Sequence, residues 1–151
     1  MKPILEEFVR MAKKKMEPKE AVVAPEKKFL SSGSTLLNLN ISNHPDHAFL
    51  AGHTHWLVGD SSSGKTMFGL SMFAEAALSP DFKGYRFIYD DTEKGCQFDL
   101  EAFFGQDMTQ RLEPPRLDKE TGFPAYSEFL EDFYFSVDDA IKDSRPFIYI
   151  L

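Results

Sequence analysis

Gly59-Asp60-Ser61-Ser62-Ser63-Gly64-Lys65-Thr66, residues 59–66, is the stretch that decides the fold of this sequence. It fits the pattern Gly-x-x-x-x-Gly-Lys-Ser/Thr, in which glycines let the chain curl so that backbone N–H groups point at phosphate oxygens. Lys65 is expected to reach the β and γ phosphates of a nucleoside triphosphate, and the Thr66 hydroxyl to bind Mg²⁺. The segment therefore predicts a P-loop in which all eight residues contribute to phosphate binding.

The residues on either side of this loop fit the setting that a P-loop requires. His55-Trp56-Leu57-Val58 is a short apolar run directly before the loop, and it predicts a buried strand over residues 55–58. Residues 67–78 then place four apolar side chains on one helical face, and Ser79-Pro80 ends the pattern. These four are Leu70, Phe73, Ala74 and Ala77. Strand, loop and helix follow one another in the required order.

Two further strands and a helix are predicted after the loop. Residues 85–89 form a second strand candidate, and residues 146–151 form a third. Between them, residues 126–141 predict a helix whose apolar face recurs at steps of three and four. Its members are Tyr126, Phe129, Leu130, Phe133, Val137, Ala140 and Ile141. Three strands separated by helical segments indicate an α/β fold of three layers around a mostly parallel sheet.

The stretch between the second strand and this helix carries capping signals and a predicted loop. Asp99 is suited to cap a short helix through Phe104, and Gly105 to the left-handed position after its end. Residues 106–124 are polar and interrupted by Pro114-Pro115 and Gly122, which predicts a long loop.

Asp90-Asp91-Thr92-Glu93 follows directly on the second predicted strand. Ligands of parallel sheets collect beyond the carboxyl ends of the strands, where the P-loop also lies, so a carboxylate here could face the γ phosphate. Glu93 is the residue we select to orient or deprotonate the attacking water. The alternative is that these acids form only a solvated turn after the strand.

These blocks together resemble the core of the RecA superfamily, particularly the RecA-like ATPases and recombinases encoded by bacteriophages. The resemblance covers residues 29–151 and rests on three segments: Ser32 to Asn38, Gly59 to Thr66, and Phe87 to Glu93. Leu37-Asn38 stands where the family usually has Leu-Asp. The family's water-activating glutamate lies in a strand-end Asp-x-Glu, which Asp91-Thr92-Glu93 matches. The resemblance implies ATP as the nucleotide and assembly of copies into a ring or filament.

The resemblance also implies that residues 147–151 are the strand before the Walker B aspartate. The chain is therefore expected to be a core truncated after its third strand, with the DNA-contacting loops beyond residue 151. The function that this implies is ATP hydrolysis coupled to DNA recombination or repair. A RecA-like replicative helicase, a P-loop phosphotransferase and a nucleotide-dependent assembly module remain alternatives.

Composition and charge limit the other possibilities. Residues 1–28 carry a net charge of +3 and predict a short amphipathic helix with a flexible arm, whereas residues 29–151 carry −10. An acidic body does not favour direct nucleic-acid binding by these residues. The single cysteine, Cys96, cannot form an internal disulfide, and neither a secretory signal nor a long apolar run is visible. We expect a cytoplasmic protein that does not cross a membrane.

Overall fold

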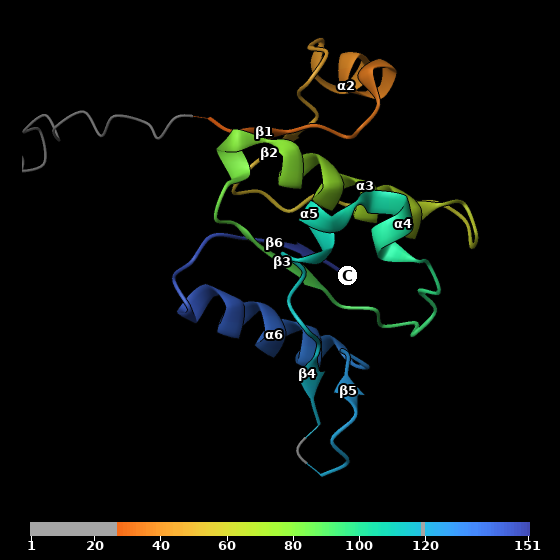
Figure 1. Ribbon diagram of the computed structural model, residues 1–151, viewed down its shortest axis with the longest axis vertical. Coiled ribbons are helices and arrows are strands. Elements are labelled where there is room, and N and C mark those ends of the chain that lie inside the picture. The colour runs from red at the N-terminus through yellow and green to blue at the C-terminus, as the bar shows by residue number, and fades with distance from the viewer. Residues whose placement is uncertain (1–26, 119) are drawn as a thin grey trace, which may run out of the picture.

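The computed structural model describes residues 27–118 and 120–151, which form a mixed α/β arrangement (Figure 1). The predicted N-terminal helix and nearly all of the predicted arm lie outside these residues. The elements are, in chain order, β1 (Phe29–Leu30), α2 (Thr35–Ser42), β2 (Phe49–Leu50), α3 (Lys65–Leu78), the 3-10 helix η1 (Pro80–Phe82), β3 (Arg86–Tyr89), α4 (Leu100–Phe104), α5 (Gln106–Thr109), β4 (Arg116–Leu117), β5 (Pro124–Ala125), α6 (Leu130–Lys142) and β6 (Phe147–Ile150).

The centre of the fold is the parallel pair of β3 and β6, which were predicted as the second and third strands. Their register joins Arg86 to Phe147 and Tyr89 to Ile150. Figure 1 shows α3, α4 and α5 on one face of this pair and α6 on the other. The helices thus enclose the pair in three layers. β1–β2 and β4–β5 are separate antiparallel pairs, so the parallel sheet has two strands rather than the three expected.

The strand predicted over residues 55–58 is wrong. These residues have no strand geometry, and the side chains of Trp56 and Val58 are 88% and 90% exposed. A strand needs a neighbour for its backbone groups, and within residues 27–118 and 120–151 β6 pairs only with β3. The apolar run indicated a buried strand. Whether residues 55–58 pair with another strand depends on residues far away in the sequence, which a local pattern does not contain.

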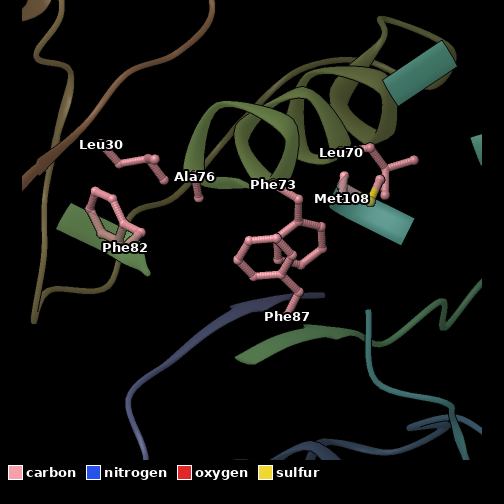
Figure 2. Packing of buried hydrophobic residues seen from close by; sticks show 7 residues of the cluster. All are labelled: Leu30, Leu70, Phe73, Ala76, Phe82, Phe87 and Met108. Atoms are coloured by element: carbon pink, nitrogen blue, oxygen red, sulfur yellow. The ribbon is translucent and has the colours of Figure 1, made fainter. Parts of the chain in front are cut away.

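Helix α3 supplies most of the core and confirms the predicted apolar face. Leu70 and Phe73 are fully buried, and Phe73 stacks on Phe87 of β3 with ring centroids 4.9 Å apart. Figure 2 shows these side chains together with Leu30, Ala76, Phe82 and Met108. Burial of one such large apolar side chain contributes roughly 1.5–3 kcal/mol. The helix begins two residues earlier than predicted, at Lys65, so its first turn is formed by the loop motif itself.

The segment predicted as a long loop, residues 106–124, contains α5 and β4 and carries a half-buried arginine. The Arg111 guanidinium lies 4.1 Å from the Phe87 ring and donates to the carbonyl oxygens of Ala76, Phe82 and Tyr85. Carbonyls at the end of a helix need such donors. Burial lowers the pKa of Arg111. The anchoring role of Arg111 could not be predicted from hydrophobic periodicity, because a single side chain holds this segment on the core.

The Asp99 cap is confirmed, since its carboxylate accepts from the Ala102 N–H at 3.0 Å. Gly105 has a positive φ of 83° but an extended ψ of 163°, so it connects α4 to α5 instead of forming a left-handed cap.

The predicted helix over residues 126–141 begins later, at Leu130, and ends at Lys142. Asp132 accepts from the N–H groups of Glu128 and Phe129, which satisfies backbone donors at the helix start. Ala140 is buried, whereas Leu130 and Ile141 are 77% and 61% exposed. The apolar stripe is therefore wider than the face that packs on β6.

Candidate phosphate-binding site

The loop 59–66 has the backbone shape that its glycines predict. Gly64 takes the left-handed conformation, with φ +87° and ψ 14°, directly before α3, and Ser62 also has a positive φ of 59°. The first hydrogen bond at the start of the helix runs from the Phe68 N–H to the Gly64 carbonyl. The N–H groups before Phe68 are thus those that a helix leaves without an intrahelical partner, and they suit an anion.

Lys65 folds back over this loop. Its Nζ donates to the carbonyl oxygens of Gly59, at 3.0 Å, and of Asp60, at 2.7 Å. A methyl group placed at Gly59 would lie 2.8 Å from the Ser63 Oγ, so a larger residue here would displace the Ser63 hydroxyl. A phosphate oxygen is a stronger partner for an ammonium than a neutral carbonyl. The loop therefore holds a cation in a position where it can exchange carbonyl partners for phosphate.

The loop lies near the carboxyl end of the parallel pair. Figure 1 shows the start of α3 on the same side of the molecule as the carboxyl ends of β3 and β6. A Cβ built on Gly69 would lie 3.2 Å from the Ile150 Cγ2, so this turn of α3 rests on the end of β6. Lys65 is four residues before Gly69 and lies on the same helix face.

The acidic segment 90–93 separates into residues with different surroundings. Asp90 is 6% exposed, and its carboxylate accepts from the Ser127 N–H at 2.9 Å and from the Ser127 and Tyr149 hydroxyls at 2.5 Å each. Asp91 accepts from the N–H groups of Gly95 and Cys96, which closes the turn after β3.

Glu93 is exposed, and no hydrogen bond or ion pair joins its side chain to any other described residue. The loop 59–66 and the segment 90–93 lie on the same side of the molecule in Figure 1, although no bond links them within the part of the chain that is described. Glu93 is therefore the carboxylate of this segment that is available to a ligand, whereas Asp90 and Asp91 are committed to the fold.

Two tyrosines beside these acids have raised pKa values. Burial is the main cause for both. For Tyr89, the neighbouring side chains of Cys96 and Asp91 raise the pKa further. For Tyr149, the hydrogen bond to Asp90 adds to burial and raises the pKa to about 12. Both hydroxyls are therefore neutral at physiological pH, and the Tyr149 hydroxyl donates to Asp90.

The partners of the acidic segment were missed from the sequence. Ser127 and Tyr149 are 37 and 59 residues from Asp90, and Glu128 forms an ion pair of 2.7 Å with Lys94. No local pattern connects residues at such separations. The position of the aspartates directly after a strand was the only signal of a site here. It did not indicate which residues donate hydrogen bonds to them.

Asn38 is held by hydrogen bonds on both sides of its amide group. It is 2% exposed, and its Oδ1 accepts from the Ser32 N–H and hydroxyl. Its Nδ2 donates to the Ser31 hydroxyl and to the Pro45 carbonyl, at 2.7 Å. A carboxylate could not make the bond to the Pro45 carbonyl, because it has no N–H to donate. The amide thus holds the start of α2 in place.

A cavity of about 170 Å³ lies on the other face of the pair, between β3, the β4–β5 hairpin and α6. Arg86, Asp90 and Tyr149 line it. None of the loop residues 59–66 contributes to the lining of this cavity.

Comparisons of the chain with protein families, with curated proteins and with solved structures each give no match. Across residues 27–118 and 120–151, no helix combines the length and the apolar character that crossing a membrane requires.

Proposed function

We propose that this chain binds Mg²⁺ and ATP at residues 59–66 and is part of a RecA-like ATPase core. The observation that carries the proposal is the arrangement of Lys65. Its ammonium lies over a glycine-stabilised loop at the start of a 14-residue helix, beside the carboxyl end of a parallel strand pair. In this proposal Lys65 contacts the β and γ phosphates, the amides of residues 61–66 surround the β phosphate, and Thr66 holds Mg²⁺.

Glu93 is the proposed base for hydrolysis. The support is chemical availability. The carboxylates of Asp90 and Asp91 accept hydrogen bonds from Ser127 and Cys96, whereas the side chain of Glu93 is exposed. A carboxylate that orients water must have a free oxygen toward the nucleotide.

The coupling of hydrolysis to DNA recombination or repair, and assembly into a ring or filament, are proposals that rest on the resemblance of the motifs. A replicative helicase, a phosphotransferase and a nucleotide-dependent assembly module use the same loop. Measured phosphate transfer to a small acceptor would favour the phosphotransferase, and light scattering with and without ATP would test the assembly module.

The decisive experiment measures ATP affinity by titration calorimetry in the presence of Mg²⁺. Lys65→Ala removes the cation, and a charge-assisted contact of about 1.5–3 kcal/mol corresponds to a loss of roughly 10- to 100-fold in affinity. Lys83→Ala is the matched control because Lys83 is an exposed lysine outside the loop. Equal affinity of the original chain and Lys65→Ala would contradict the proposal, as would the absence of any ATP binding.

A further inference from the structure

We propose that Ser127 and Tyr149 are positioning residues that fix Glu93 through the buried carboxylate of Asp90. The inference rests on the proposed function, because it assigns these side chains a part in ATP hydrolysis. Neither residue belongs to the loop or to the acidic segment. They reach Asp90 from the segment before α6 and from β6.

The Asp90 carboxylate is buried, and its hydrogen-bonding capacity is occupied by the fold. Both carboxylate oxygens accept hydrogen bonds, one from the Ser127 N–H and the other from two hydroxyls. The Asp90 N–H also donates to the Ile150 carbonyl at 2.8 Å, which continues the ladder of the parallel pair. A buried carboxylate that loses a hydrogen-bond donor still pays the free-energy cost of its lost hydration. We therefore expect the backbone at Asp90 to shift until the carboxylate regains a donor.

A second link joins the same two stretches of chain. The Lys94 ammonium contacts the Glu128 carboxylate at 2.7 Å, with more than half of each side chain exposed. An ion pair in water holds its partners weakly. The hydrogen bonds to Asp90 therefore control the position of the turn that follows β3. The ion pair of Lys94 with Glu128 has only a weak influence on it.

Glu93 lies between these two links. The Lys94 N–H donates to the Asp91 carbonyl, and the Asp91 carboxylate accepts from Gly95 and Cys96, so the turn is a closed unit. Its orientation relative to the strands is then set where it joins β3, at Asp90. A shift of this joint displaces the Glu93 carboxylate without touching the loop 59–66.

The test separates hydrolysis from binding. Ser127→Ala and Tyr149→Phe each remove one hydroxyl from Asp90, and misplacement of a reacting group costs up to about 100-fold in rate. We expect kcat to fall at least about tenfold while the affinity for Mg·ATP stays within about twofold. Ser127→Thr keeps a hydroxyl and should restore most of the rate.

Hydrogen exchange supplies a readout that needs no hydrolysis. The N–H groups of Gly95 and Cys96 are bound by Asp91, so both variants should exchange them faster as the turn loosens. Tyr134→Phe is the control for a lost hydroxyl, since Tyr134 is exposed on α6. Leu30→Ala is the control for lost stability, since Leu30 is buried in the core shown in Figure 2. Both controls should retain kcat.

The outcomes are distinguishable. If the original chain binds and hydrolyses ATP but both variants keep its kcat, the positioning role is wrong. If Leu30→Ala lowers kcat as much as they do, the effect is loss of stability and the role is again wrong. If the original chain does not bind ATP, the proposed function fails. If it binds ATP without measurable turnover, kcat cannot report on the positioning role. Hydrogen exchange at Gly95 and Cys96 then decides whether Asp90 holds the turn. Unchanged exchange in both variants would show that it does not.

Discussion

Individual residues in this protein acquire their chemical roles from their neighbours. Asp90, Asp91 and Glu93 are acids within four positions of one another, yet one is buried under three donors, one closes a turn and one faces water. Hydrogen-bond donors stabilise the charged form of a carboxylate and occupy its oxygens. The three acids are thus unequal as candidates for contact with a nucleotide, although the sequence presents them side by side.

Replacement of Glu93 by Gln tests the role of the exposed acid. The amide keeps the size and one acceptor oxygen but loses the basic charge, and general-base catalysis is worth about 10²–10⁴ in rate. We expect kcat for ATP hydrolysis to fall at least about a hundredfold while the affinity for Mg·ATP changes little. Steady-state kinetics and calorimetry on the same preparation check both values.

The same measurements on Asp90→Asn and Asp91→Asn complete this test. Hydrolysis that persists in Glu93→Gln but disappears in one of these variants would assign the base to that aspartate, and the comparison with the Asp-x-Glu pattern would be wrong.

At the scale of elements, sequence patterns predicted what local periodicity can encode. They located α3, β3, the Asp99 cap and β6, and most of α6. They did not predict the hairpin of β4 and β5 or the start of α6, which depends on the side chain of Asp132. The motif at residues 59–66 could be recognised because it consists of consecutive residues, whereas Ser127 and Tyr149 approach Asp90 from distant parts of the chain.

The contact between α3 and β6 predicts the effect of filling Gly69. A Cβ at this position already lies 3.2 Å from Ile150, so Gly69→Leu would force the helix away from the strand. Overpacking of this kind costs about 1–3 kcal/mol in the free energy of unfolding. Gly69→Ala is the matched control, because about 1 kcal/mol of helix propensity offsets its tighter contact.

Urea denaturation followed by circular dichroism measures both Gly69 variants. A lower midpoint for Gly69→Leu than for Gly69→Ala is the expected result. Equal midpoints would mean that α3 and β6 do not pack closely at this turn.

For the whole molecule, a few polar side chains join the layers across the strand pair. Arg86 leaves β3 to contact Glu113 and Asp143 at 3.2 and 3.3 Å, and it donates to the Ala140 carbonyl of α6. Tyr149 of β6 joins Asp90 and packs its ring against Phe133 of α6, with centroids 5.7 Å apart. The layer formed by α6 is therefore held by both polar and aromatic contacts.

The raised pKa of Tyr149 predicts how stability changes at alkaline pH. The folded value of about 12 exceeds the ordinary value of 10.0, so folding favours the protonated hydroxyl. Its contribution to the free energy of unfolding is complete below about pH 10 and is lost as the pH rises through about 12. Tyr149→Phe cannot ionise there, and its stability should fall less steeply over this range.

Denaturation midpoints of both proteins from pH 9 upward check this, since all other groups that titrate are shared. Parallel decline of the two midpoints would show that the Tyr149 hydroxyl does not ionise more weakly in the folded chain.

The exposed side chain of Trp56 provides an intrinsic fluorescence probe. It is the single tryptophan of the chain, it is 88% exposed, and it stands three residues before the loop 59–66. Indole emission moves to shorter wavelength when water leaves the ring, so all tryptophan fluorescence reports on this one segment. Addition of nucleotide without any attached dye would reveal whether the residues leading into the loop become sheltered when phosphate binds.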